Sequence, residues 1–165
     1  MLTGFANLLL AGAMLTHPAA SLQEIDGLRL RDQHGIEDSL AAHRGRVVVV
    51  MVVEARRLRT LKAWERDLRE RFDGIEFLRI AEVPDDPPPS YERVAAKLAE
   101  QVPEGVPVLI DMERRWATAL GLDPGRPNLL LVNPAGGLEA VFTGRHEPGL
   151  AAEVAARLDE LVGRP

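Results

Sequence analysis

The run at residues 45–53 constrains the fold of this chain more than any other feature of its sequence. It reads Gly-Arg-Val-Val-Val-Val-Met-Val-Val and leads directly into a polar turn at residues 54–60. A continuous β-branched run between a glycine and a polar turn is typical of a strand buried on both faces, as in the interior of α/β sheets. We therefore expect residues 47–53 to form the central strand. The turn that follows would then lie at the carboxyl edge of the sheet, where open α/β folds bind their ligands.

The rest of the sequence predicts helices that alternate with strands. Helices with one apolar face are expected at residues 58–72, 91–102, 112–120 and 150–162. Further strands are expected at residues 28–30, 75–81 and 106–110, and a hairpin at 129–132 and 138–142. Pro107 favours an edge position or a strand start for the segment 106–110. The proline-rich segment 83–89 is expected to be a surface loop, because proline lacks the backbone N–H.

Composition limits the classes of function. With 165 residues, of which 46% are hydrophobic, the chain suits one compact domain with a substantial core. The net charge of -5 argues against a general binder of nucleic acids or anionic membranes, because those partners require a dominant basic field. The chain has no cysteine, which removes disulfides, thiolate catalysis and sulfur-ligated metals.

Residues 1–20 have features of a secretory signal. An apolar stretch from Leu8 to Leu15 precedes the small residues Ala19 and Ala20. Against a signal, no Lys or Arg precedes Arg29, and the apolar run is too short to span a bilayer. The alternative is an N-terminal extension. The balance of these features favours export, to the periplasm or beyond, with a cytoplasmic location if residues 1–20 are not a signal.

The order of these elements, together with Gly-Arg-Pro-Asn-Leu-Leu-Leu-Val-Asn-Pro-Ala-Gly-Gly at residues 125–137, resembles the thioredoxin-like superfamily. The nearest branches are exported redoxins of the TlpA and peroxiredoxin type, and the resemblance covers residues 24–162. It implies an α/β fold, a three-layer sandwich whose central mixed β-sheet has helices on both faces. It also implies that Pro127 is the cis proline that faces the active site and shapes the peptide-binding surface. From the residues alone, a trans proline at a strand start is the alternative.

The chain departs from this family where the redox cysteines should be. Redox-active members carry Cys-x-x-Cys, or one peroxidatic cysteine, just after the central strand, where a helix N-terminus lowers the thiol pKa. The window here is Arg57-Leu58-Arg59-Thr60, in which no His or Asp could activate the threonine. The resemblance therefore implies no thiol oxidoreductase, isomerase or peroxidase activity. The chain is also similar to YtfJ-type exported proteins, whose strand likewise runs into a non-cysteine turn.

No other catalytic, metal or cofactor site is evident. The four histidines are scattered, so we expect solvated or capping side chains rather than zinc ligands. Asp85 and Asp86 fall far short of the ligands that calcium needs, and no phosphate-binding glycine motif occurs. Trp64 and Trp116 fall on apolar stripes, which indicates core packing. We therefore assign no catalytic residue, no metal and no cofactor.

One cluster conflicts with the local rules of helix formation. Arg56, Arg57, Arg59 and Lys62 crowd the expected first turn of the helix at 58–72, where the helix dipole prefers acidic residues. Such conflicts are expected mainly at functional sites. The alternative is a solvated basic face whose charge nearby carboxylates offset.

The binding hypothesis places a peptide, an envelope protein or a small anion on this turn, with Pro127 as the opposite wall. Its residues are Arg56, Arg57, Arg59, Thr60 and Pro127. The sequence thus favours a non-catalytic binding or accessory module of the cell envelope, because no base, nucleophile or metal set converges. The alternative is a divergent redoxin-family enzyme that uses a partner's cysteine or chemistry independent of cysteine.

Overall fold

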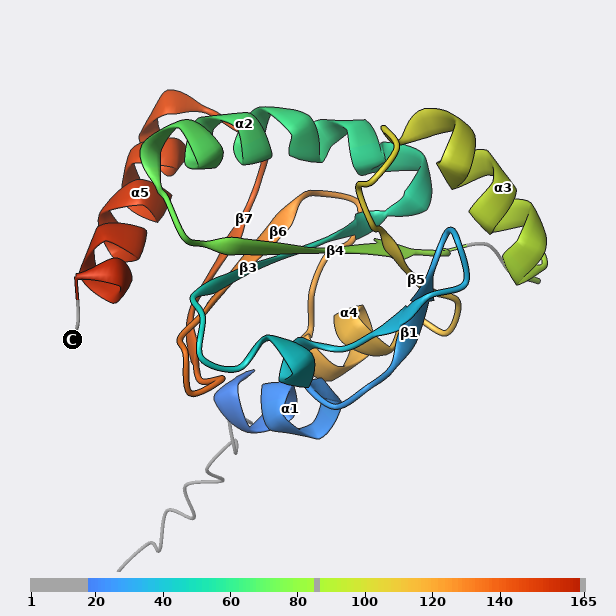
Figure 1. Cartoon of the computed structure of the whole chain (residues 1–165), viewed down its shortest axis with the longest axis horizontal. Helices are drawn as coiled ribbons and strands as arrows, with labels where there is room; N and C mark the ends of the chain where they lie inside the picture. Colours follow the sequence, from blue (N-terminus) through green and yellow to red (C-terminus); the bar gives the residue numbers. More distant parts are fainter. Residues whose placement is uncertain (1–17, 85–86, 164–165) are drawn as a thin grey trace, which may run out of the picture.

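The computed structural model describes residues 18–84 and 87–163, and within them it forms one seven-stranded mixed sheet (Figure 1). The strand order is β2-β1-β5-β4-β3-β6-β7. The strands are β1 Leu30–Asp32, β2 Glu37–Asp38, β3 Val48–Glu54, β4 Glu76–Glu82, β5 Leu109–Asp111, β6 Asn128–Val132 and β7 Leu138–Thr143. The α-helices are α1 Pro18–Ile25, α2 Leu61–Arg71, α3 Tyr91–Gln101, α4 Arg115–Leu120 and α5 Pro148–Val162, and the 3-10 helices are η1 Leu40–His43 and η2 Ala55–Thr60.

Strand β3 occupies the interior position that its β-branched run predicts. It pairs in parallel with β4 and antiparallel with β6, so that Val50 lies opposite both Leu78 and Leu130. Every residue of β3 is buried. Both neighbours are strands that the sequence predicts, and the predicted hairpin of β6 and β7 is confirmed.

Helices cover both faces of the sheet, because alternate side chains of β3 point to opposite sides. Val49, Met51 and Val53 pack with α2 and α5, which lie on one side of the sheet in Figure 1. Val48 and Val50 pack with α1 and α4 on the other side. The three-layer α/β sandwich is therefore confirmed. The buried tryptophans belong to these two layers, with Trp64 on α2 and Trp116 on α4, as their apolar stripes predict.

Helix α3 packs against β4 and β5. Its apolar residues Val94 and Leu98 pack against Ala81, Val108 and Ile110. Ser90 caps the start of this helix, because the backbone N–H of Arg93 donates to Ser90 Oγ at 3.3 Å. This cap satisfies one of the free amides that begin any α-helix.

Strand β5 differs from the expectation of an edge position. It lies inside the sheet, between β1 and β4. Pro107 precedes the strand, which begins at Leu109. None of the hydrogen bonds between β5 and its neighbours therefore requires the N–H that proline lacks. The strand-start alternative drawn from Pro107 is the one that the structure supports.

Two helices begin later than the sequence predicts. The segment expected to open the helix at 58–72 is the 3-10 helix η2, and α2 begins only at Leu61. Helix α4 begins at Arg115 rather than at residue 112. There the Asp111 carboxylate accepts the backbone N–H of Glu113 at 3.2 Å and that of Trp116 at 2.9 Å, and Arg114 takes a left-handed conformation with φ of 56°. Side-chain acceptors of this kind compete with helix formation and so delay the start of the helix.

The N-terminal part of the described chain belongs to the core. Leu22 and Ile25 of α1 are buried on the α4 side of the sheet. Most of the possible signal, residues 1–17, lies outside the described residues, as do Asp85 and Asp86. In the part of the chain that the structure describes, no helix has both the length and the apolar character needed to cross a membrane.

Candidate functional site

Three acidic residues form a row at the carboxyl edge of the sheet. Glu54 ends β3, Glu82 ends β4 and Asp111 ends β5. The parallel register places Glu54 opposite Glu82 and Glu82 opposite Asp111. The sequence alone does not predict this row. An acidic residue at the end of each buried parallel strand was its only signal, and that signal becomes informative only when the strand order is known.

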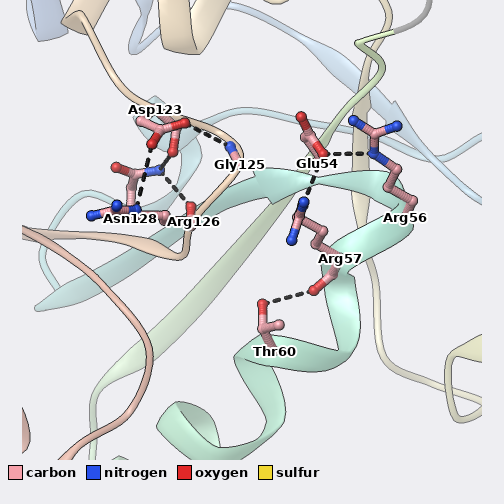
Figure 2. Close-up of polar contacts among 8 residues, drawn as sticks. All are labelled: Glu54, Arg56, Arg57, Thr60, Asp123, Gly125, Arg126 and Asn128. Atoms are coloured by element: carbon pink, nitrogen blue, oxygen red, sulfur yellow. Dashed lines mark hydrogen bonds and ion pairs between the residues drawn. The ribbon is translucent and has the colours of Figure 1, made fainter.

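Glu54 is neutralised by the turn that follows it. Its Oε2 accepts hydrogen bonds from Arg56 Nε at 2.7 Å and from Arg57 Nε at 3.1 Å (Figure 2). The hydrogen bond from Arg56 lowers the pKa of Glu54, and Arg57 adds to this effect, although burial opposes it. Glu54 is therefore ionised at neutral pH. The offset of basic charge by Glu54 that the sequence offered as an alternative is present for these two arginines.

Glu82 is in a different state from Glu54. Its side chain is fully buried, and Oε1 accepts the backbone N–H of Ala117 at 2.6 Å. Among the described residues no hydrogen bond reaches Oε2, which lies 3.9 Å from Arg114 Nε. Burial raises the pKa of Glu82 to about 7, against the opposing effect of the Ala117 amide, and the nearby Asp111 adds to the rise. This carboxyl group therefore changes protonation near neutral pH.

Each acidic residue of the row already contacts other groups of the protein. Asp111 is occupied with the amides at the start of α4, and Glu54 with its two arginines. Glu82 lines none of the three cavities that the arginines of η2 line, so a substrate in those cavities would not reach it. Within the described ranges, no three His, Asp or Glu side chains are arranged to hold a metal ion.

The arginines of the predicted site line three different cavities. Arg56 lines a cavity of about 420 Å³ beside α3, which we call the α3 cavity. Arg57 lines one of about 480 Å³ beside the ends of β6 and β7, the β6–β7 cavity. Arg59 lines one of about 340 Å³ beside α2, the α2 cavity. The sequence predicts one site for these arginines, whereas the fold distributes them over three cavities.

The 3-10 geometry of η2 separates Arg57 from the other two arginines. A 3-10 helix has three residues per turn, so Arg56 and Arg59 share a face while Arg57 points elsewhere. Consistent with this, the α3 and α2 cavities share Gln101 as a lining residue. Thr60 lines none of the three cavities, and its Oγ1 donates to the carbonyl of Arg57 at 2.7 Å.

The β6–β7 cavity is where the turn after β3 approaches the Pro127 loop. Arg57 comes from η2, Arg126 from the loop before β6, and Arg145 from the segment after β7. The backbone N–H of Glu54 donates to the Pro124 carbonyl at 2.8 Å, which ties the end of β3 to this loop. Pro127 itself is buried, and its carbonyl accepts the N–H of Gly144 at 2.9 Å.

Asn128 fixes the shape of this loop, and the sequence analysis did not recognise it. Its buried Nδ2 lies within hydrogen-bonding distance of the carbonyls of Asp123 at 2.8 Å and Arg126 at 2.9 Å (Figure 2). The Val52 carbonyl lies 3.2 Å from the same atom. Its Oδ1 accepts a hydrogen bond from Thr143 Oγ1 at 2.8 Å. A polar residue at the head of an apolar strand was the available signal, because a buried amide needs partners.

Two histidines contact carboxylates of other segments rather than solvent alone, which corrects the expectation from the sequence. His43 lies between Glu76 Oε2, at 2.6 Å from Nδ1, and Asp38 Oδ2, at 2.9 Å from Nε2. Burial lowers the pKa of His43, but the hydrogen bonds and charges of the two carboxylates outweigh it and leave the pKa raised. His146 Nε2 lies 3.1 Å from Asp67 Oδ2. These contacts join segments that are distant in the sequence.

Known proteins match this chain in structure but not in sequence. No protein-family model matches it, and no curated protein shows significant sequence similarity. The structure is similar to the exposed lipoprotein thioredoxin of Streptococcus pneumoniae, with a TM-score of 0.62 and 16% identity over 78% of this chain and 97% of that one. It is also similar to peroxiredoxin Q of Xanthomonas campestris, with a TM-score of 0.58 and 18% identity over 90% and 98% of the two chains.

These similarities agree with the element order that the sequence predicts. Identities this low establish the fold and leave the activity of the chain open. The turn after β3 has arginines where the fold allows a reactive thiol, and the sequence contains no cysteine at any position. The protein therefore has a thioredoxin-like α/β fold, and its sequence has no cysteine.

Proposed function

We propose that this protein is a non-catalytic binding module that holds an acidic segment of another protein in the β6–β7 cavity. The observation that carries the proposal is the convergence of Arg57, Arg126 and Arg145 on one cavity of about 480 Å³. Three separate segments contribute these side chains. Guanidinium groups bind carboxylates through paired N–H donors, so the chemistry of the lining favours an acidic peptide.

The charge of the lining supports an anionic ligand. Glu147 is the one carboxylate that faces the three arginines across the cavity. Arg126 lies 3.7 Å from Asp123, and both side chains are more than half exposed, so that pair holds the arginine only weakly. Because Arg57 is already paired with Glu54, Arg126 and Arg145 supply the positive charge that the lining offers to a ligand, in a protein whose net charge is -5.

Hydrogen bonds hold the segments around the proposed site in place. A ligand therefore binds a preformed site rather than a mobile surface. Asn128 fixes the loop that carries Arg126, and its partner Thr143 belongs to the cavity lining. The bond from Glu54 N–H to the Pro124 carbonyl ties this loop to the end of β3. A preformed site loses less conformational entropy when a ligand binds.

A location in the cell envelope is part of the proposal. It is supported by the signal-like features of residues 1–20. The fold is shared with a pneumococcal thioredoxin described as an exposed lipoprotein. The partner would then be another protein of the envelope.

Removing two of the arginines tests the site. Arg126→Gln combined with Arg145→Gln should abolish stabilisation by a blocked hexaglutamate peptide at low ionic strength. A ligand at a hundredfold excess over its Kd stabilises a fold by about 2.7 kcal/mol, which a thermal-shift assay resolves as several degrees. The effect should fade as salt rises, because screening extends over about 10 Å at 0.1 M.

The matched control is Arg29→Gln combined with Arg115→Gln. It changes the net charge equally at exposed positions that line none of the three cavities. This variant should still respond to the peptide. The three proteins compared are wild type, the Arg126/Arg145 variant and this control. If the peptide shifts the melting temperature of none of them, or shifts all three equally, the β6–β7 cavity is not an anion site.

A further inference from the structure

The α2 cavity has walls of a different character from those of the β6–β7 cavity. It lies between α2 and the segment that leads from the end of α3 into β5, with a volume of about 340 Å³. Its apolar lining residues are Leu58, Leu61, Val102, Pro103, Val106 and Val108. Cavities of this size with mainly apolar walls are typical of small-molecule sites.

A row of cations borders this apolar space. Arg59, Lys62 and Arg66 are spaced three and four residues apart, which places them on one face of η2 and α2. All three side chains are exposed. None of them forms an ion pair with another residue of the described ranges.

The one carboxylate in the lining is already occupied. Glu65 Oε1 accepts Arg69 Nε at 2.8 Å, and its Oε2 accepts Arg79 Nε at 2.8 Å. Burial raises the pKa of Glu65, but Arg79 and Arg69 outweigh that effect and leave the pKa lowered. Glu65 is therefore ionised and shared by two guanidinium groups, so it does not neutralise the cations at the border.

The lining also indicates what kind of anion would fit. Gln101 is the one neutral polar side chain in the lining. The carbonyl oxygen of Val106 accepts a hydrogen bond from Gln33 Nε2 at 2.8 Å, so this acceptor already has a partner. A peptide backbone placed here would leave its own N–H and C=O groups without partners, which is costly. An apolar body with one anionic group has no such requirement.

We propose that the α2 cavity binds a small carboxylate with an apolar chain, its chain against Val102 and Val106 and its carboxylate at Lys62 and Arg66. This site is separate from the β6–β7 cavity, which shares no lining residue with it. The two proposals therefore stand or fall independently.

Three probes separate the contributions of chain and charge. Octanoate below its micelle concentration is the full probe, 1-octanol has the chain without the charge, and acetate has the charge without the chain. Isothermal titration at low ionic strength should show octanoate binding about tenfold more tightly than 1-octanol, and acetate should show no measurable binding. Equal binding of octanoate and 1-octanol, or of octanoate and acetate, would overturn the proposal.

Two variants then locate the site. Lys62→Gln with Arg66→Gln should weaken octanoate about tenfold and leave 1-octanol unchanged, because only the charge contacts are lost. Arg29→Gln with Arg115→Gln is the charge-matched control and should bind octanoate like wild type. Val106→Trp fills the apolar space and should weaken both ligands. Since Lys62 and Arg66 are exposed, their substitution tests the site even if Val106→Trp impairs folding. Octanoate affinity that is unchanged in the Lys62/Arg66 variant would contradict the assignment.

Discussion

The buried carboxyl group of Glu82, at the end of β4, accepts a hydrogen bond from the backbone amide of Ala117 on α4 at 2.6 Å. This contact anchors α4 to the carboxyl edge of the sheet. It also puts a titratable group where no solvent reaches it. Folding therefore disfavours the ionised form, which makes stability depend on pH.

Glu82→Gln should stabilise the protein above neutral pH. The folded pKa of about 7 lies above the ordinary value of 4.5, so between these values the unfolded state loses its proton first and stability falls as pH rises. Above pH 7 the substitution should recover up to about 3 kcal/mol, and below pH 4.5 almost nothing. Urea unfolding at pH 4.5 and pH 8 measures the difference. The exposed control Glu100→Gln should change stability by less than about 0.5 kcal/mol at either pH, and an equal effect of Glu82→Gln at both pH values would contradict a raised pKa.

His43→Gln should destabilise the protein most at mildly acidic pH. The raised pKa of His43 means that its paired, charged form contributes fully below the ordinary value of 6.5 and is lost as pH rises through the folded pKa. The loss on substitution should therefore be larger at pH 6 than at pH 9, as measured by chemical denaturation. His34→Gln removes an exposed histidine and is the control. A loss that grows with pH would show that the two carboxylates do not hold the proton.

Glu65→Leu should be strongly destabilising because it leaves a cation without its partner. The Arg79 side chain is 7% exposed, and without Glu65 its remaining hydrogen-bond partner among the described residues is the Pro107 carbonyl at 3.4 Å. Breaking a buried pair in this way costs about 3–5 kcal/mol, whereas replacing both partners by apolar residues is often neutral. The double variant Glu65→Leu with Arg79→Met should therefore be more stable than Glu65→Leu alone in urea unfolding. The reverse order would show that Arg79 finds solvent.

Val50→Asp should abolish folding. Val50 is fully buried between β4 and β6, and an unpaired buried charge costs several kcal/mol, comparable to the stability of a whole domain. The matched control is Val141→Asp on β7, where the side chain is 38% exposed. Circular dichroism should show a folded control and an unfolded Val50 variant. A folded Val50→Asp protein would contradict the interior position of β3.

The purified protein should neither reduce insulin disulfides nor consume hydroperoxide with a thioredoxin-type reductant. Both reactions need an attacking thiolate, and the sequence contains no cysteine. A turbidity assay and a peroxide-consumption assay measure the two activities. Turnover in either assay would require chemistry that is independent of cysteine, and would contradict a non-catalytic role.

The sequence by itself determined much of the architecture. The β-branched run before Glu54 could be stable only inside a sheet, and the apolar stripes of α2 and α5 required a sheet face to cover. The glycine at position 121, with φ of 62°, ended α4 where the sequence predicts. These features can be predicted locally, because the spacing of apolar residues within one segment shows which of its faces is buried.

Only the tertiary structure decided how the polar groups are combined. Arg56, Arg57 and Arg59 are close in sequence, yet they line three cavities. The 3-10 helix η2 turns Arg57 away from the other two, and residues of α2 and α3 form the separate cavities beside Arg59 and Arg56. Glu82 became a buried acid only through the strand order and the docking of α4. The spacing of apolar residues along a segment shows which face of that segment is buried. The charges and cavity walls that a side chain contacts are instead set by segments far away in the chain.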